Sequence, residues 1–328
     1  MTSADGRPNP GLLAVLQLRA QLYQLIRGFF AARGVLEVET PIFSAGANTE
    51  PNIESFHVHF SGPLRDGGPR TRWLRTSPEF ALKRLLAQGI GDCYELGRVF
   101  RDGEAGRRHN PEFTLLEWYR IGWSQFDLAA ETCDLIERAL ALVERRPRRE
   151  VHSYRALYQA AFGFDAFTAP VDDLKVPLAD QGIQADDLSR EDWLDLLMTH
   201  RLQPEFEDDV LRVIHGFPPS QCALARIVGQ GSDAVAARYE VYLGDSELAN
   251  GYHELTDAVE QRARFEHDNR RRRARGQGEL PIDEHLLTAL QSGLPDCAGV
   301  ALGVDRLLMA MLDTDRIAAV LAFDFARA

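Results

Sequence analysis

The apolar residues near the start of the chain recur every three or four positions, which is typical of an amphipathic helix. This pattern covers residues 12–34, and Gly34 is a suitable residue for the end of a helix. The residues that share the apolar face are Leu18, Leu22, Leu25, Ile26 and Phe29.

Shorter alternating patterns follow and predict strands. Residues 35–41 (VLEVETP) alternate until Pro41, and 56–60 and 72–75 (FHVHF, RWLR) predict two strands around a turn-rich segment. A helix is predicted to start at Pro78. The stretches CYELGRVF and TLLEWYRIGW predict two antiparallel strands joined by a charged loop.

The second half of the chain changes character twice. Residues 151–220 carry scattered helical patterns without recognisable chemistry and are interpreted as a helical insertion. Residues 238–256 predict strand, and 257–276 predict a helix with an acidic first turn and a basic last turn. A short helix is predicted near Pro281, and 299–312 predict a strand that runs into a helix. These elements indicate an α+β fold.

Composition excludes several classes of protein. With 328 residues, 45% of them hydrophobic and 26% charged, the chain can bury one large core or two moderate ones. We expect no export signal and no membrane span, because the first residues lack a basic start and a hydrophobic stretch. The cysteines form no C-x-x-C pair, so neither zinc nor disulfides are expected, and a reducing cytoplasm fits.

The charge of the chain, and its distribution, indicate which binding partners to expect. The chain holds 49 acidic and 37 basic residues, a net charge of -12, which argues against a broad nucleic-acid surface. Residues 97–120 nevertheless contain five arginines, a histidine and four carboxylates. Such a segment is either a solvated hairpin with salt bridges or a site that holds a small polyanion.

Three segments, taken in order, resemble the signature motifs of class II aminoacyl-tRNA synthetases. They are the helix that leads into RGVLEVETP, the strand pair around FRDGEAGRRHNPEF, and GVALGVDRLLM. The strings TSPEFALKRLL, RHNPEFTLLEWY and ELANGYHELTDA resemble the lysyl-tRNA synthetase branch. The resemblance implies a catalytic domain over 12–328 after a polar leader, 1–11, with an antiparallel sheet flanked by helices. It also implies a homodimer formed through residues 34–41.

The resemblance implies activation of an amino acid by ATP. A carboxylate that attacks the α-phosphate of ATP needs positioned cations more than a proton shuttle. Arg101 and Arg306 are the expected catalytic residues, and Arg107 is assigned to a solvated hairpin tip. Glu104 is assigned to the site because the family's glutamate position is Gly103 here. The expected ATP-binding residues are Arg101, Glu104, Arg108, His109, Phe113, Glu240 and Arg306.

Two glutamates match the pair that holds magnesium against the ATP phosphates in this family. They are Glu240 and Glu247. Magnesium prefers hard oxygen ligands together with substrate phosphates. Without the motif context, both side chains would be ordinary surface carboxylates on strands.

A second group of residues matches the amino acid pocket of the family. A side-chain ammonium needs negative charge, which three glutamates of the group supply, although each alone would more often be a strand-face or helix-cap residue. The expected members are Ser77, Glu79, Glu117, Tyr119, Asn250, Tyr252, Glu254 and Ala301.

Two kinds of difference from lysyl-tRNA synthetases change the substrate that we expect. Ser77 and Ala301 stand where the synthetase has alanine and glycine, and an added methyl or hydroxyl changes which amino group fits. About eleven residues precede the first helix, too few for the anticodon-binding barrel, which needs roughly thirty residues plus turns. With the string PDCAGVALGVDR, these features resemble the paralogues that attach (R)-β-lysine to a lysine of elongation factor P. We therefore do not expect tRNA binding.

Two other functions compete with this one. The first is a truncated synthetase that still charges tRNA, which the basic run 270–273 would favour. These arginines also complement a helix dipole without any partner. The second is a silent regulatory paralogue, which is disfavoured because Arg101, Arg306, Glu240 and Glu247 are all retained.

Overall fold

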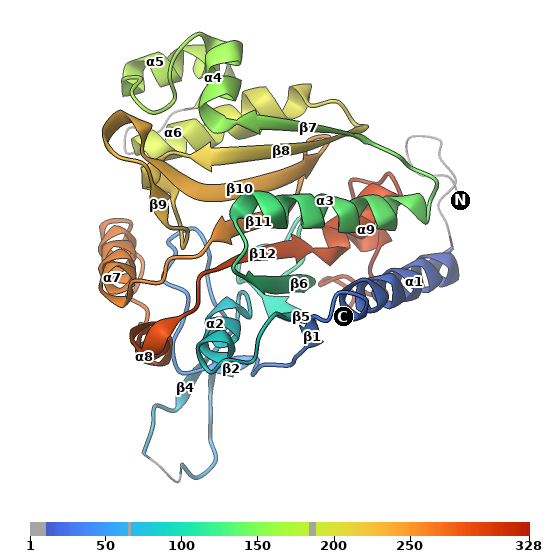
Figure 1. The fold of residues 1–328 in the computed structure, drawn as a ribbon, viewed down its shortest axis with the longest axis vertical. Coiled ribbons are helices and arrows are strands. Elements are labelled where there is room, and N and C mark those ends of the chain that lie inside the picture. The colour runs from blue at the N-terminus through green and yellow to red at the C-terminus, as the bar shows by residue number, and fades with distance from the viewer. Residues whose placement is uncertain (1–10, 65–66, 184–187) are drawn as a thin grey trace.

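The computed structural model describes residues 11–64, 67–183 and 188–328, so the predicted leader lies outside them except for Gly11 (Figure 1). The helices are α1 Leu12–Ala31, α2 Glu79–Ala87, α3 Gln125–Ala141, α4 Tyr154–Phe162, α5 Val171–Lys175, α6 Arg190–Leu197, α7 Ala258–Ala274, α8 Glu284–Gly293 and α9 Val304–Met311. Short 3-10 segments are η1 Val176–Gln181, η3 Gln203–Glu205, η4 Pro219–Gln221, η5 Gly231–Asp233 and η6 Ile317–Ala319, and η2 Met198–Leu202 is a short π-helical segment. The strands are β1 Leu36–Glu37, β2 Phe43–Ser44, β3 His57–His59, β4 Thr71–Leu74, β5 Cys93–Phe100, β6 Glu112–Ile121, β7 Arg148–Ser153, β8 Val210–Phe217, β9 Ile227–Val228, β10 Val235–Leu243, β11 Ser246–His253 and β12 Cys297–Gly303.

A large, mostly antiparallel sheet organises the molecule. Over the described residues it has nine strands in the order β1-β5-β6-β12-β11-β10-β8-β7, with β9 beside β10. The two outermost pairs, β1 with β5 and β7 with β8, are parallel. The predicted antiparallel pairing of β5 with β6 is confirmed. The two predicted strands β3 and β4 are also present, and they pair antiparallel in a separate small sheet.

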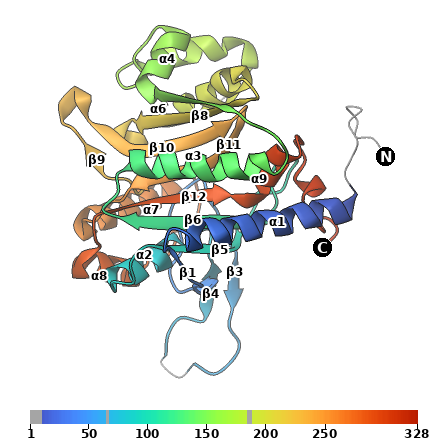
Figure 2. The same cartoon turned by 45° about the vertical axis from the view of Figure 1, so that its right-hand side comes forward.

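One face of the large sheet is covered by α1, α3 and α9 (Figure 2). Their apolar side chains form the main core with alternate residues of the central strands. Leu22, Ile26 and Trp118 within it have no exposed surface. Burial of this kind stabilises the fold by about 25 cal/mol per Å² of apolar surface removed from water.

On the opposite face, two groups of helices pack near the two ends of the sheet. The helices α4, α5 and α6 pack on β8 and β10, while α2, α7 and α8 pack near β5 and β6. The central strands between these two groups of helices carry polar side chains toward a cavity. A potential site therefore lies on this face of the sheet, over its central strands.

The predicted insertion is partly helical, but residues 151–220 also contain a strand that the prediction missed. Strand β8, Val210–Phe217, lies inside the central sheet and pairs with β7 and β10. Apolar residues of β8 are buried on both faces, Leu211 and Val213 in the main core and Ile214 and Phe217 under α4 and α6, so the strand shows no simple alternation of apolar and polar residues. The predicted strand 35–41 is also shorter, since β1 covers only Leu36–Glu37.

Two predicted helices end close to the glycines that were expected to stop them. Helix α1 ends at Ala31, with Ala32 as its C-cap, three residues before Gly34, and α7 ends at Ala274, two residues before Gly276. Gly34 and Gly276 have φ of 68° and 73°, a backbone conformation that glycine adopts without strain. Asp257 caps α7 by accepting from the N–H groups of Val259 and Glu260. Within the described residues, none of the helices combines the length and the apolar character needed to cross a membrane.

Candidate active site

Strand alternation separates the core from the cavity. On β6, Leu116 and Trp118 face the main core, whereas Glu117 and Tyr119 face the cavity. Neighbouring strands keep the same alternation because their side chains are in register. Glu117 pairs with Ala301 on β12, Ala301 with Asn250 on β11, and Asn250 with Glu240 on β10. Four predicted site residues thus form one row across the floor.

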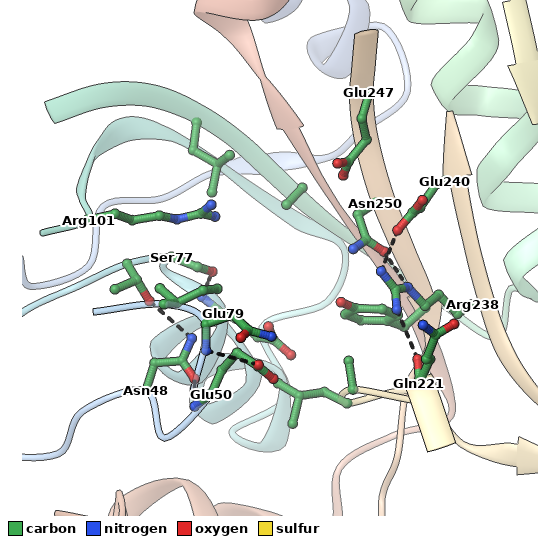
Figure 3. Close-up of a pocket in the computed structure, with 18 of the residues that line it drawn as sticks. Asn48, Glu50, Ser77, Glu79, Arg101, Gln221, Arg238, Glu240, Glu247 and Asn250 are labelled. Carbon is green, nitrogen blue, oxygen red and sulfur yellow. Dashed lines mark hydrogen bonds and ion pairs between the residues drawn. The ribbon is translucent and has the colours of Figure 1, made fainter. Parts of the chain in front are cut away.

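The cavity has a volume of about 760 Å³ and is lined by all sixteen predicted site residues. Figure 3 shows part of this lining, including Arg101, Glu240 and Glu247. The predicted residues come from the start of α2 and the segment before it, the β5–β6 hairpin, β10, β11 and the residue after it, β12 and α9. The residues brought together are Ser77, Glu79, Arg101, Glu104, Arg108, His109, Phe113, Glu117, Tyr119, Glu240, Glu247, Asn250, Tyr252, Glu254, Ala301 and Arg306.

Arg101 projects into the cavity from the end of β5. Its guanidinium carbon lies 5.1 Å from the centre of the Phe113 ring, and Nη1 lies 3.5 Å from Glu104 Oε1. The Nε atom is buried and has no hydrogen-bond partner among the residues that the structure describes. A buried donor without a partner is costly, so this group suits an anionic ligand.

Arg306 closes the same end of the cavity from α9. Its Nη1 donates to the carbonyl oxygen of Glu247 at 3.0 Å, and its Nη2 lies 2.9 Å from His109 Nε2. Burial and the positive charge of Arg306 lower the pKa of His109, so the ring is neutral and Nε2 accepts. Arg108 pairs with Asp245 at 2.7 Å. Arg107 is outside the cavity lining and pairs with Asp315 at 2.8 Å.

Glu79, Glu117 and Glu254 form the acidic half of the cavity, with Glu117 at its centre. Ser77 Oγ donates to Oε2 of Glu117 at 2.6 Å and Tyr119 Oη donates to its Oε1 at 2.8 Å. Ser77 Oγ also accepts from the N–H of Glu79. Burial, reinforced by the charge of Glu79, raises the pKa of Glu117 to about 8, so the protonated form prevails at neutral pH.

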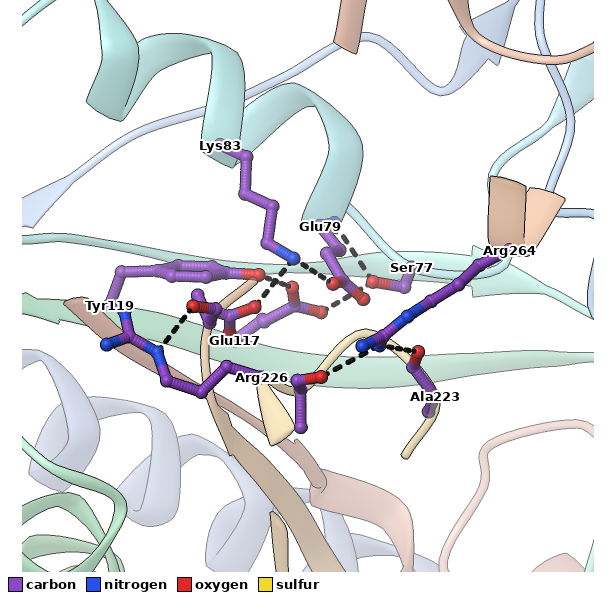
Figure 4. Close-up of polar contacts among 10 residues, drawn as sticks. Ser77, Glu79, Lys83, Glu117, Tyr119, Ala223, Arg226 and Arg264 are labelled. Atoms are coloured by element: carbon purple, nitrogen blue, oxygen red, sulfur yellow. Dashed lines mark hydrogen bonds and ion pairs between the residues drawn. The ribbon is translucent and has the colours of Figure 1, made fainter. Parts of the chain in front are cut away.

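Lys83 is a residue that the sequence reasoning missed (Figure 4). Its Nζ lies 2.6 Å from Glu79 Oε1 and 2.6 Å from Glu254 Oε2. The side chain is 1% exposed. The spacing of four residues between Glu79 and Lys83 on one helix is a signal that would have found the first contact. The contact with Glu254 depends on the tertiary fold.

Arg238 is the second residue that was missed. It pairs with Glu240, and its Nη1 donates to the carbonyl oxygen of Gln221 at 2.9 Å. Tyr242 donates a hydrogen bond to Glu240 at 2.5 Å. Alternation on β10 places Arg238 and Glu240 on one face, which is a sequence signal for this pair.

Glu240 and Glu247 fit a cation held jointly with phosphates. Burial raises the pKa of Glu240, and the charge of Glu247 raises it further, so a cation between them would relieve their repulsion. The described residues contain no group of three or more side chains arranged to hold a metal by themselves. Two carboxylates plus substrate phosphates are a usual magnesium environment.

Gly299 on β12 allows the side chains of Tyr119 and Glu254 to lie close to the sheet. A Cβ at this position would lie 2.3 Å from Tyr119 Cε1 and 2.5 Å from Glu254 Oε1. Glycine is therefore required for Glu254 and Tyr119 to meet over the cavity floor.

Comparison with known proteins agrees with this geometry. Residues 6–327 match the model of tRNA synthetases class II (D, K and N), and the chain belongs to this family. It is 44% identical over 312 residues to the elongation factor P--(R)-beta-lysine ligase of Mannheimia succiniciproducens, with 95% of each chain covered. The protein of the same name from Salmonella arizonae is 45% identical over 329 residues, 99% of each chain. That from Pseudoalteromonas translucida is 42% identical, over 96% of this chain and 97% of its own.

Proposed function

We propose that this protein activates (R)-β-lysine with ATP and transfers it to a lysine side chain of elongation factor P. The relatives that match this chain over nearly their whole length are named elongation factor P--(R)-beta-lysine ligase. The observation that carries the proposal is one cavity with two halves. Arg101 and Arg306 supply cationic groups for a triphosphate, and the Glu79 and Glu254 carboxylates supply negative charge for an ammonium.

In the first step, a carboxylate oxygen of the amino acid attacks the α-phosphorus of ATP. The bond to pyrophosphate breaks, and a mixed carboxylic–phosphoric anhydride forms. Arg101 would stabilise the charge that develops on the α-phosphate, and Arg306 would hold the terminal phosphate together with Arg108 and His109. Arginine suits this work because its planar fork provides paired donors that stay charged. Phe113 would stack on the adenine ring, beside Glu104.

Magnesium would be held by Glu240 and Glu247. When bound with the nucleotide, it would neutralise negative charge on the phosphate oxygens. Arg238, which pairs with Glu240, keeps that carboxylate fixed on the cavity wall.

In the second step, the ε-amine of the acceptor lysine attacks the activated carbonyl. A C–N bond forms, the C–O bond to AMP breaks, and the amine releases a proton. The amine must be neutral to attack, and a cationic surrounding favours its neutral form. Arg101 is the cationic group expected nearest the reacting carboxylate.

Selectivity for a β-amino acid is proposed to depend on Ser77 and Ala301. Ala301 lies on the cavity floor between Glu117 and Asn250. Its methyl reduces the depth available to a substrate, which displaces or rejects a ligand that fits against glycine. The Ser77 hydroxyl already donates to Glu117, so its effect on the substrate acts through that carboxyl. Tyr119, Asn250 and Tyr252 would complete the pocket.

The proposal extends to assembly and location. We propose a homodimer formed through residues 34–41, where Leu36 is 53% exposed and the nearby Phe43 is 56% exposed. An acceptor that acts in translation places the enzyme in the cytoplasm. The proposed acceptor is a protein, so aminoacylation of tRNA is not expected.

Mass spectrometry of elongation factor P tests the proposal. After incubation with this protein, ATP and (R)-β-lysine, one acceptor lysine should gain the mass of a β-lysyl group, and omission of ATP should prevent this gain. The unchanged mass of elongation factor P in the complete reaction would contradict the proposal. Charging of purified tRNA under the same conditions would favour the truncated synthetase instead.

A further inference from the structure

Lys83 is a buried cation that neither step of the proposed reaction uses. It projects from α2 one turn after Glu79, and its side chain is 1% exposed. Lys83 is not among the described residues that line the cavity, whereas Glu79 and Glu254 are. The ammonium therefore lies behind the two carboxylates and contacts both, at 2.6 Å each.

The contact fixes the direction of Glu254. Both oxygens of Glu254 are buried and lack a well-aligned hydrogen bond among the described residues, but Oε2 forms an ion pair with Lys83 at 2.6 Å, whereas Oε1 lies beside Gly299 on the cavity floor. A carboxylate held by one oxygen directs the other toward a ligand. Lys83 thus joins α2 to the end of β11 at the place where a substrate ammonium would bind.

The contact with the two glutamates also determines the protonation state of Lys83. Burial lowers the pKa of Lys83, but the charges of Glu254 and Glu79 more than compensate and leave the pKa above its ordinary value. Lys83 is therefore an ammonium at neutral pH. When Glu117 is protonated and Glu79 and Glu254 are ionised, the three carboxyl groups and this ammonium together carry one negative charge.

We propose that Lys83 is a positioning residue of the amino acid site: it holds Glu79 and Glu254 in place and leaves the site with the charge to accept one substrate ammonium. This inference rests on the proposed function and deepens it. Lys83 acts through the two glutamates and touches no reacting atom. A mere structural role would affect stability without changing how recognition of the amino acid responds to pH.

Other titratable groups surround this cluster and enter its pH dependence. Burial is the main cause of the raised pKa of Glu254, to about 7, and Lys83 opposes the rise. Loss of Lys83 would therefore raise the pKa of Glu254 further, so that more of it is protonated at pH 7. The groups facing the cluster are Glu117 and Tyr119 on β6, Tyr252 on β11, Cys93 on β5, Cys297 on β12, and Arg226, which donates to the backbone oxygen of Glu254.

The test is pyrophosphate exchange driven by (R)-β-lysine, measured from pH 6 to 9 for the wild-type protein and Lys83→Met. The variant should raise KM for the amino acid about tenfold or more at pH 7, because a charged hydrogen bond to the substrate is weakened. KM for ATP should change less than about threefold, since the phosphate half is untouched. The acid limb of log(kcat/KM) for the amino acid should move up by about one pH unit.

An acid limb at the wild-type pH, or equal rises in both KM values, would overturn the inference while leaving the proposed function intact. Absence of exchange in the wild-type protein would instead overturn the proposed function, and this inference with it. If thermal melting shows that Lys83→Met is unfolded, Lys83→Arg is the test, because it keeps the cation but moves it. Its acid limb should stay at the wild-type pH while KM for the amino acid rises; a wild-type KM would overturn the inference.

Discussion

At the scale of single residues, protonation distinguishes the glutamates of the cavity. Glu117 has two donors, from Ser77 and Tyr119, and a pKa raised to about 8 mainly by burial. Glu254 has the Lys83 ammonium beside it and a pKa of about 7. Glu254 therefore ionises more readily than Glu117, which makes it the better partner for an ammonium.

Glu117→Gln should make stability less dependent on pH. A pKa raised above the ordinary value of 4.5 means that the folded state binds a proton that the unfolded state has lost. This stabilisation is complete below pH 4.5 and is lost as pH rises through about 8. The wild-type free energy of unfolding should therefore fall by about 2 kcal/mol from this group between pH 6 and 8, and the variant should lack this fall. Urea unfolding at both pH values measures it, and equal slopes for the two proteins would contradict the assignment.

Arg306→Ala should abolish adenylate formation without unfolding the protein. Its guanidinium is bound to a backbone oxygen and to His109 at the cavity wall, so its loss removes a phosphate contact and little packing. Pyrophosphate exchange should fall by at least about a hundredfold, as expected when a charged transition-state contact is lost. Arg107→Ala is the matched control, since this nearby arginine is 65% exposed and pairs only with the surface residue Asp315 among the ion pairs described. Normal exchange in Arg306→Ala, or equal losses in both variants, would refute the role.

At the scale of elements, Asp305 connects the three segments that carry the family motifs. It lies on α9, its Oδ1 is 2.5 Å from Arg19 Nη2 on α1, and its Oδ2 accepts from the N–H of Thr114 on β6. Asp305 is 2% exposed. One buried carboxylate thus fixes α1 and α9 against the strand that carries Glu117.

Asp305→Asn should destabilise the fold. The substitution keeps the shape but removes the charge, and it leaves the partly buried Arg19 without its carboxylate. The free energy of unfolding should fall by about 3 kcal/mol, the usual cost of breaking a buried pair. Asp315→Asn, which breaks the exposed pair with Arg107, should cost no more than about 1 kcal/mol. Chemical denaturation compares the two, and similar losses would show that Asp305 does not join these elements.

The sequence predicted most elements because local signals decide them. The apolar face of α1, Gly34 and Gly276, and the hairpin of β5 and β6 all follow from patterns within a few residues. Strand β8 was missed because burial on both faces removes the alternation that marks a strand. The site residues were chosen through the family resemblance, since their convergence depends on the register of β6, β12, β11 and β10. Lys83 and Arg238 were missed because partner choice in an ion pair is set by the tertiary structure.

At the scale of the whole molecule, the cavity lies between two groups of helices. An ion pair joins them, since Arg275, which follows α7, lies 3.1 Å from Asp192 on α6. The opposite face of the sheet is closed by α1, α3 and α9. An acceptor lysine must therefore approach from the side of the sheet that α6 and α7 border.

The proposed homodimer predicts a change of mass on substitution of Leu36. Light scattering at micromolar concentration should give twice 36.8 kDa for the wild-type protein. Leu36→Lys should shift the population toward the single-chain mass, because a lysine in an apolar contact must be desolvated. Val151→Lys is the control, since Val151 is 62% exposed on β7, at the other edge of the sheet from β1. A wild-type protein of single-chain mass, or identical behaviour of the two variants, would exclude a dimer through this segment.

The alternation on β12 allows recognition of the amino acid to be changed separately from the core. Ala298 and Leu302 belong to the main core, Gly299, Ala301 and Gly303 border the cavity, and Val300 takes part in both. A mutant library confined to Ala301 and the other cavity-facing positions of β6 and β11 would vary recognition without disturbing the framework. Directed evolution from such a library is a practical way to obtain catalysts that install non-natural β-amino acids on proteins.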